Sequence, residues 1–430
     1  MKFFNYSFFL VLFFIGSFSS LADEEFDFGE EVSIGGPKEN EKKDFSLGGN
    51  LSFKMGHQIG NPKRWMDLGP SLKLKGSLQK HWGTVKVDFD SEFNFAFKIE
   101  DDDQDLAKDS LPTNTLREFF WQKSFGKHTF KIGKKIVVWG KADALVVTDV
   151  LTPKDLSLLF FTDIEKARIG QFLLEWDLYL EKIEMNVYVI PYPLYNKSPE
   201  QGHPYGLPKA LTLKNREEFS KSKQAPELAL RINRQWEWGS TAFLLASLHN
   251  RDPLMIMENL FTYKETHRRY FFTGLTSNIA FKNFLLKAEI AYEKDKPLQA
   301  QTNIVKKDFL SSMIGFDYNH TQRGNWVLEY SVTGPLQQED SLTQKDWQHL
   351  VLFSWSKNFL HEDLNLNLGL TFYDDLKNTL FSLNTRYHFN DSWQSSLSFT
   401  MIDFKRPLST LPFSNFNQFD RVDLSLKYSF

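Results

Sequence analysis

Residues 85–100 read VKVDFDSEFNFAFKIE, and they show the pattern that runs through most of this chain. Valine, phenylalanine and isoleucine occupy most of the odd-numbered positions, while lysine, aspartate, glutamate and asparagine occupy most of the even ones. Side chains of a β-strand point alternately to opposite faces, whereas a helix would scatter these residues around its circumference. The stretch therefore predicts a strand with one apolar and one charged face.

The same alternation recurs along the rest of the chain from residue 45 to residue 430. The clearest segments are 47–55, 72–78, 130–138, 174–180, 183–189, 228–232, 286–292, 326–332, 364–372 and 422–430. Long links alternate with short turns, except near 374–378, where a short link stands in place of a long one. This layout predicts a transmembrane antiparallel β-barrel of about 18 strands (16–20), all-β in class, with long loops outside and short turns inside.

The chain ends on an alternating strand. The residues that carry the pattern are Leu424, Leu426, Tyr428 and Phe430. This ending resembles the C-terminal signature of bacterial outer-membrane barrels, which the barrel-assembly machinery reads. The resemblance implies location in the outer membrane of a Gram-negative bacterium, with that machinery, membrane lipid and lipopolysaccharide as partners.

Composition agrees with this fold and excludes other classes. Hydrophobic residues make up 41% of the 430, charged residues 24% and aromatic residues 16%, and the net charge is −3. A basic nucleic-acid binder is therefore not expected. The chain is too polar for membrane helices, which is expected of a barrel whose strands are apolar only at alternate positions. Its many aromatic residues are expected at the two membrane interfaces. The absence of cysteine excludes disulfides, Cys-ligated metals and a Cys nucleophile.

The N-terminal region has the form of a targeting segment. Residues 1–22 combine Lys2, a short apolar run and small residues before Asp23, as in a cleaved secretory signal peptide. The alternative is an uncleaved membrane anchor. Residues 23–44 are predicted to be a periplasmic N-terminal lead-in, and residues 45–430 the barrel.

The most irregular stretch follows the predicted strand 130–138. Thr152 is a plausible N-cap with Pro153 at the first helical position, which predicts a short helix from 153 to about 160. By parity this is the third external loop. Because it mixes apolar and charged residues, we expect it to fold into the lumen or pack on the barrel rim as a constriction.

This loop also carries a resemblance to an uncharacterised Gram-negative outer-membrane porin-like barrel family. Its signature is a Val-x-x-Trp-Gly-x-x-Asp segment followed by an Asn-Pro-x-Asp segment. The matching residues are Trp139, Gly140, Asp143, Pro153 and Asp155. Thr152 stands where Asn is usual, and Lys141 where an acid is common. The resemblance implies a role in export or in transport of lipid and other hydrophobic substrates.

Charged residues suggest how such a loop would select solutes. The candidate constriction residues are Asp143, Asp149, Lys154, Asp155, Asp163, Lys166 and Arg168. The candidate lumen-lining residues are Lys86, Asp88, Asp90, Glu92, Lys131, Lys135 and Arg231. Loop acids facing wall bases would set up a transverse field that favours polar solutes. The alternative is an ordinary solvated lumen with balanced charges.

Motifs for catalysis or metal binding are missing from the sequence. There is no Gly-x-Ser-x-Gly elbow and no His-Glu-x-x-His pattern, and Ser247 and His249 have no assigned acid. The acid-rich stretch 101–109 is predicted to be a solvated loop, with weak calcium binding as the alternative. We therefore predict no enzyme, no metal site and no cofactor.

Two functions remain open at this stage. The first is a porin-like channel that passes or selects small solutes through a charged lumen. The second is a component of an export or hydrophobic-substrate transport system, or a non-conducting barrel with an enzymatic or structural role.

Overall fold

The computed structural model describes residues 44–60, 63–96, 113–158, 161, 164–199, 212–214, 226–259, 262–300, 303–339, 341–342, 346–373, 378–404 and 419–430. The predicted signal peptide (1–22) and nearly all of the lead-in (23–44) lie outside these residues. Within them, no helix has the length and apolar character needed to cross a membrane.

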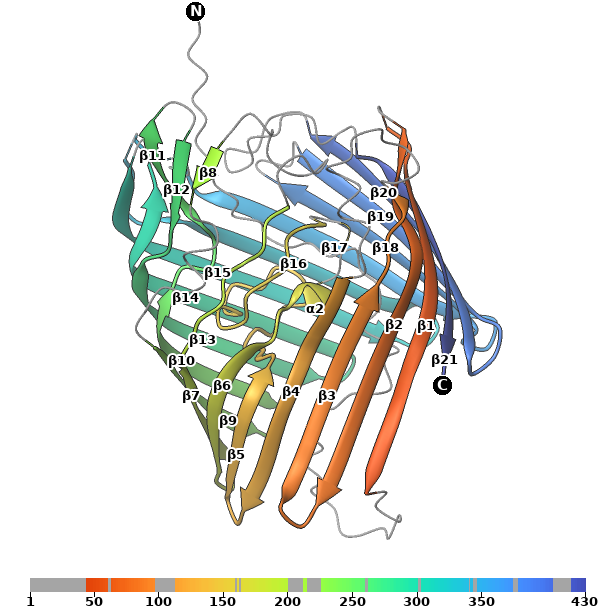
Figure 1. Cartoon of the computed structure of the whole chain (residues 1–430), viewed down its shortest axis with the longest axis horizontal. Helices are drawn as coiled ribbons and strands as arrows, with labels where there is room; N and C mark the ends of the chain where they lie inside the picture. Colours follow the sequence, from red (N-terminus) through yellow and green to blue (C-terminus); the bar gives the residue numbers. More distant parts are fainter. Residues whose placement is uncertain are drawn as a thin grey trace, which may run out of the picture.

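Eighteen strands form one closed antiparallel barrel, as the alternation predicted (Figure 1). The strands are β1 (Phe45–Gln58), β2 (Arg64–Lys80), β3 (Gly83–Glu92), β4 (Thr113–Phe125), β5 (His128–Lys135), β6 (Gln171–Tyr179), β7 (Ile183–Ile190), β9 (Glu227–Trp236), β10 (Gly239–His249), β13 (Arg269–Phe281), β14 (Phe284–Gln299), β15 (Ile304–His320), β16 (Gly324–Pro335), β17 (Gln348–Phe359), β18 (Leu364–Tyr373), β19 (Asn378–His388), β20 (Trp393–Phe404) and β21 (Arg421–Ser429). Each pairs with its neighbours around the ring, so the predicted number of 18 is confirmed.

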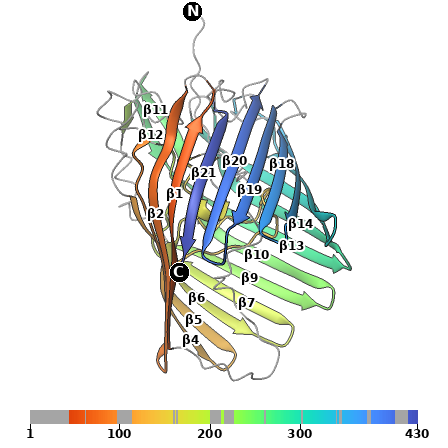
Figure 2. The same cartoon turned by 90° about the vertical axis from the view of Figure 1, so that its right-hand side faces the viewer.

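The first and last strands close the barrel. β1 and β21 pair in register from Asn50 with Ser429 to Gln58 with Arg421, and Gly49 and Phe430 exchange backbone hydrogen bonds of 3.0 Å. Figure 2 shows β1 and β21 side by side with the C-terminus at the end of β21. Closure leaves no sheet edge with unpaired N–H and C=O groups, which a hydrocarbon environment requires.

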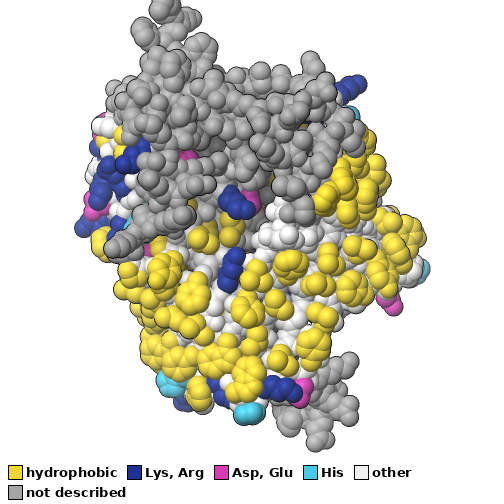
Figure 3. All heavy atoms as spheres, viewed as in Figure 1, with side chains coloured by type: hydrophobic (Ala, Val, Ile, Leu, Met, Phe, Trp, Pro, Cys, Tyr) yellow, Lys and Arg dark blue, Asp and Glu magenta, His cyan; other side chains and the backbone are white. Residues whose placement is uncertain are grey.

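The two faces of the barrel wall differ in the way the sequence pattern predicted. Large apolar side chains stand exposed on the outer face, as with Leu47, Leu51 and Phe53 on β1, while the interior face carries most of the buried polar groups. Figure 3 shows apolar side chains covering the visible wall, with basic and histidine side chains along its lower rim. Trp82 and Trp393 lie exposed at strand ends, as expected for an interfacial girdle.

A second, three-stranded sheet was not predicted. It comprises β8 (Thr212–Lys214), β11 (Leu254–Asn259) and β12 (Thr262–Thr266), with β11 and β12 antiparallel and β12 and β8 parallel. It lies at the upper end of the barrel in Figure 1. The hairpin β11–β12 lies in the connection between the barrel strands β10 and β13.

Two strands are shorter than predicted, each for a local reason. β3 ends at Glu92, although the alternation continues to Ile99. Beyond it the Phe93 N–H still donates to the Pro70 carbonyl at 2.9 Å, but Pro70 has no N–H to donate in return. β5 ends at Lys135 and not at Val138, because the Ile136 N–H donates to the Glu118 side chain at 2.7 Å and leaves the ladder.

Candidate functional site

The segment 136–170 connects β5 to β6 and is braced from within. The Thr152 hydroxyl accepts from the Val137 N–H at 2.9 Å and donates to the Val137 carbonyl at 2.7 Å. Asp149 accepts from Arg168 Nε at 3.0 Å and pairs with its Nη2 at 2.9 Å. These contacts tie each end of the segment to residues 149–152 in its middle.

The helix predicted from residue 153 is wrong over the residues that the structure describes there, 153–158. Because the Thr152 hydroxyl is bound to Val137, it does not cap a helix, and Lys154 and Asp155 form β-bridges with Arg168 and Lys197. The helix that the structure describes in this segment is α2 (Ile164–Ala167), which begins eleven residues after the predicted start.

Glu289 on β14 binds the loop from the opposite wall. Its carboxylate accepts from the backbone N–H groups of Lys141, Ala142 (2.8 Å), Val147 (3.1 Å) and Thr148 (3.0 Å), and from the Thr148 hydroxyl at 2.8 Å. The residue is fully buried. Five donors to one carboxylate are charge-assisted bonds that replace its lost hydration.

Glu329 on β16 binds the loop in the same way. It accepts from the N–H groups of Asp143 (2.7 Å), Ala144 (3.2 Å) and Leu145 (3.0 Å), and it is also fully buried. Leu328, the preceding residue on β16, is exposed on the outer face, so the Glu329 side chain points inward. The two carboxylates therefore hold residues 141–148 against the interior face of β14 and β16, with β6, β7, β9, β10 and β13 between β5 and β14 in the sheet.

Lys287 joins the loop and the wall beside Glu329. Its Nζ lies 2.7 Å from Asp143, 2.9 Å from Asp317 and 3.4 Å from Glu329. Burial raises the pKa of Asp143 to about 6, although the Lys287 ammonium opposes the shift. One base thus serves three acids at the point where the loop meets β14–β16.

Apolar packing fixes the loop on both sides. Trp139 is buried between Tyr188 and Phe272, with ring centroids 6.0 and 6.1 Å away. Gly140 leaves no room for a larger residue, since a Cβ there would lie 2.0 Å from Val146 Cγ1. On the other side, the loop residues Ala144, Leu145, Val147, Leu156 and Ala167 pack with Met66, Met313, Leu350, Leu352, Tyr373, Leu380, Ile402 and Phe404.

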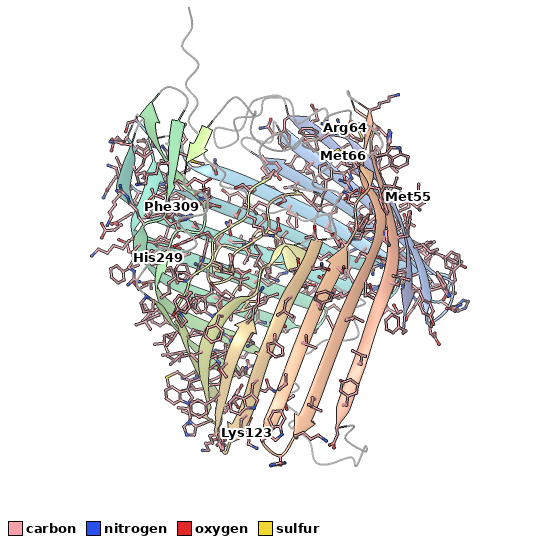
Figure 4. The ribbon with its side chains drawn as sticks, in the orientation of Figure 1. Met55, Arg64, Met66, Lys123, His249 and Phe309 are labelled. Carbon is pink, nitrogen blue, oxygen red and sulfur yellow. The ribbon has the colours of Figure 1, made fainter. Side chains whose placement is uncertain are left out.

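Arg251 and Glu227 form a further anchor near the upper rim. Arg251 donates to Glu227 (2.6 and 3.2 Å) and to the carbonyls of Val150 (3.3 Å) and Leu151 (2.9 Å). His249, marked in Figure 4, shares the same carboxylate at 3.1 Å. This acid–histidine pair is therefore part of the structure that holds the loop.

The predicted constriction residues fall into separate groups. Asp143 faces Lys287 on the wall, Asp149 pairs with Arg168 inside the loop, and Asp155 pairs with Lys197 at 3.1 Å. Lys154 also lies within the loop region, and burial there lowers the pKa of its ammonium group. Lys166 is exposed and its carbonyl accepts from Arg117, while Asp163 lies outside the described residues.

The predicted lumen-lining residues pair with neighbours on the wall. Lys131 lies 3.4 Å from Glu175 and 3.0 Å from Asp177. The other pairs are Lys135 with Glu175 (2.8 Å), Asp88 and Asp90 with Arg117 (3.8 and 3.6 Å), Glu92 with Lys54 (2.6 Å) and Arg231 with Glu184 (3.8 Å), and Lys86 lies 6.0 Å over the Phe120 ring. The bases Lys131, Lys135 and Arg231 thus contact acids of the strands and not the loop acids of the predicted field.

Sequence reasoning missed the residues that position the loop: Lys287, Glu289, Glu329, Glu227 and Arg251. A signal was present, because Glu289 and Glu329 are acids at inward positions between apolar residues, in KAEIA and VLEYS. A carboxylate in such a place needs several donors. Among the described residues, no group of three or more metal-binding side chains is arranged to hold an ion, and the stretch 101–109 lies outside them.

Solved structures with the same architecture are outer-membrane barrels. OccAB3 of Acinetobacter baumannii aligns with a TM-score of 0.55 at 10% identity, covering 90% of this chain and 99% of that one. OccK2 (OpdF) of Pseudomonas aeruginosa, solved in complex with glucuronate, gives 0.54 at 8%, covering 90% and 98%. The outer membrane protein OpdK of P. aeruginosa gives 0.52 at 8%, covering 90% and 99%.

At these identities the likeness establishes the fold. No protein-family model matches the sequence, and no curated protein matches it either.

Proposed function

We propose that this protein is a porin-like channel in the outer membrane of a Gram-negative bacterium, and that residues 136–170 form its constriction. The observation that carries the proposal is the binding of loop backbone by Glu289 and Glu329 of the opposite wall. A closed barrel of 18 strands encloses an interior, and a loop held across it narrows the route for solutes. The fold shared with OccAB3, OccK2 and OpdK supports the same function.

The surroundings follow from this proposal. The apolar outer face contacts membrane lipid, and lipopolysaccharide contacts the end that carries the long loops. Leu424, Leu426, Tyr428 and Phe430 supply the signal for the assembly machinery, and residues 1–22 direct export. The signature residues Trp139 and Gly140 shape the loop, since one is buried against the wall and the other has no room for a side chain.

Conductance across a planar lipid bilayer tests the channel directly. The purified, refolded protein should show stepwise conductance in KCl. Replacing Glu289→Gln and Glu329→Gln together weakens the charge-assisted bonds to the loop, so we expect larger or noisier steps. Glu237→Gln, in the exposed turn between β9 and β10, is the matched control and should behave like the parent. A protein that inserts but never conducts would contradict the proposal.

One observation favours the second candidate, transport of a hydrophobic substrate. Apolar side chains pack on the interior face between β6 and β14, among them Leu173, Leu244 and Phe272. Under this alternative, vesicles containing the protein would take up a fluorescent fatty acid faster than empty vesicles while KCl conductance stays absent. Conductance without enhanced uptake would exclude it.

A further inference from the structure

Below the apolar side chains that pack against the loop, the interior face of β17–β20 carries mainly uncharged polar side chains. Arg386, two residues after Asn384 on β19, is the one Lys, Arg, Asp or Glu at an inward position of these strands. We call six of the uncharged side chains the neutral wall: Ser354, Ser356, Asn367, Asn384, Ser398 and Thr400. Ser356, Asn367, Asn384 and Ser398 lie opposite one another across the four strands. Leu397 and Phe399, which flank Ser398 on β20, belong to the outer face, so the neutral wall faces inward.

Two hydroxyl pairs lie further round, at the closure of the barrel, with Asp423, Lys427 and Lys75 at the neighbouring inward positions. Ser396 and Ser425 lie 2.6 Å apart on β20 and β21, and Ser46 and Ser77 lie 2.7 Å apart on β1 and β2. In such a pair one hydroxyl donates to the other, so one O–H hydrogen and several lone pairs stay available. A surface of this kind can both donate to and accept from a solute hydroxyl.

The charged side chains elsewhere on the interior face are compensated locally. Lys131 lies within 3.4 Å of Glu175 and 3.0 Å of Asp177, and Arg117 lies between Asp88 and Asp90. Opposite charges this close produce a field that falls off steeply with distance, and salt screens it further. At these described positions a permeating ion therefore meets charges that already have an opposite partner.

We infer that the channel passes neutral, hydroxyl-rich solutes such as sugars and polyols in preference to charged solutes of equal size. The inference rests on the proposed channel function and names its substrate class. A sugar hydroxyl exchanges water for serine and asparagine partners at nearly equal free energy. A carboxylate or ammonium group loses hydration without an unpaired counter-charge in return.

Swelling of proteoliposomes measures this preference. The probes are glucose, gluconate and glucosamine, which are similar in size and differ in charge. We expect glucose to enter about five-fold faster than either charged probe, with a small reversal potential in a KCl gradient. Faster entry of gluconate or glucosamine, or strong ion selectivity, would overturn the inference while leaving the channel in place. Absence of both conductance and swelling would reject the channel itself.

Variants of the neutral wall test its role. Ser356 and Ser398 are partly exposed, and replacing both by alanine widens the route while removing two hydroxyls. Glucose entry should fall about two- to five-fold while KCl conductance is unchanged or higher. The matched control is Ser395→Ala on the outer face of β20. If glucose entry and KCl conductance both increased, the width of the route alone would govern entry, which contradicts the inference.

Discussion

Two adjacent parts of the interior face, β14–β16 and β17–β20, carry polar side chains of opposite kinds. The first carries the buried charges Lys287, Glu289 and Glu329, each of which has at least one partner in the loop. The second carries serine, asparagine and threonine, several of them partly exposed, together with Arg386 and with apolar residues that pack against the loop. The difference fits the proposed channel, in which buried charges would hold the loop in position while uncharged polar groups would face the solute.

The largest expected effect comes from removing the base that serves three acids. Lys287→Met leaves Asp143, Asp317 and Glu329 close together without their shared ammonium group. Breaking a buried pair in this way typically costs about 3–5 kcal/mol. Urea unfolding in detergent or lipid, followed by tryptophan fluorescence, should report a loss of that order.

A control and a rescue separate charge from packing in this experiment. Lys357→Met, on the outer face near Phe359, should change the free energy of unfolding by less than about 1 kcal/mol. Lys287→Met combined with Asp143→Asn removes one of the repelling acids and should recover part of the loss. Equal losses in the single and double variants would show that the charges do not determine the effect.

The contrast between charged and neutral walls also explains which features were predictable. Alternation revealed the strands because the outer face is apolar along nearly every strand, as expected for the lipid-facing side of a barrel. Leu47, Leu51 and Phe53 could be placed on the outer face without knowing any neighbour. The same rule placed Lys131 inward, where it is found paired with Asp177.

The loop could not be derived in this way, because its partners are distant in sequence. Lys141 and Ala142 bind a glutamate nearly 150 residues later, and no local pattern links them. The helix from Pro153 was predicted from a capping residue, yet the Thr152 hydroxyl was already bound to Val137. Hydrogen bonds to residues distant in sequence thus outweighed the local preference of Thr152-Pro153 for a helix start.

The next largest effect is a dependence on pH. The pKa of Asp143 is raised by burial from 3.8 to about 6. Between these values the folded state binds a proton that the unfolded state releases, so stability falls as pH rises from 4 to above 6. Since one pKa unit corresponds to about 1.4 kcal/mol, the free energy of unfolding should change by about 3 kcal/mol in total over this range.

Urea unfolding at several pH values from 4 to 7 would measure this slope. Asp143→Asn cannot titrate, so its slope over this range should be shallower than that of the parent. Asp363→Asn, in the exposed turn between β17 and β18, is the control and should keep the parent slope. Identical slopes in parent and Asp143→Asn would exclude Asp143 as the titrating group.

A smaller effect is expected from crowding the loop against the charged wall. In Gly140→Ala the new Cβ would lie 2.0 Å from Val146 Cγ1 and 3.3 Å from Glu289 Oε1. Such overpacking costs about 1–3 kcal/mol and should disturb the bonds from Glu289 to the loop, raising conductance noise. Gly126→Ala, at a turn with open space around it but a φ of 57°, tests backbone strain alone and should leave conductance unchanged.

The smallest effect on the free energy of unfolding is expected from a substitution in the neutral wall, and this substitution distinguishes the two walls most clearly. Ser398→Ala removes a partly exposed hydroxyl and leaves the ion pairs of β14–β16 intact, so unfolding should change by less than about 0.5 kcal/mol. Glucose entry should nevertheless slow, because a solute partner has been lost. Since permeation and stability would then respond to different strands, a loss of stability comparable to that of Gly140→Ala would show that both walls serve to hold the fold.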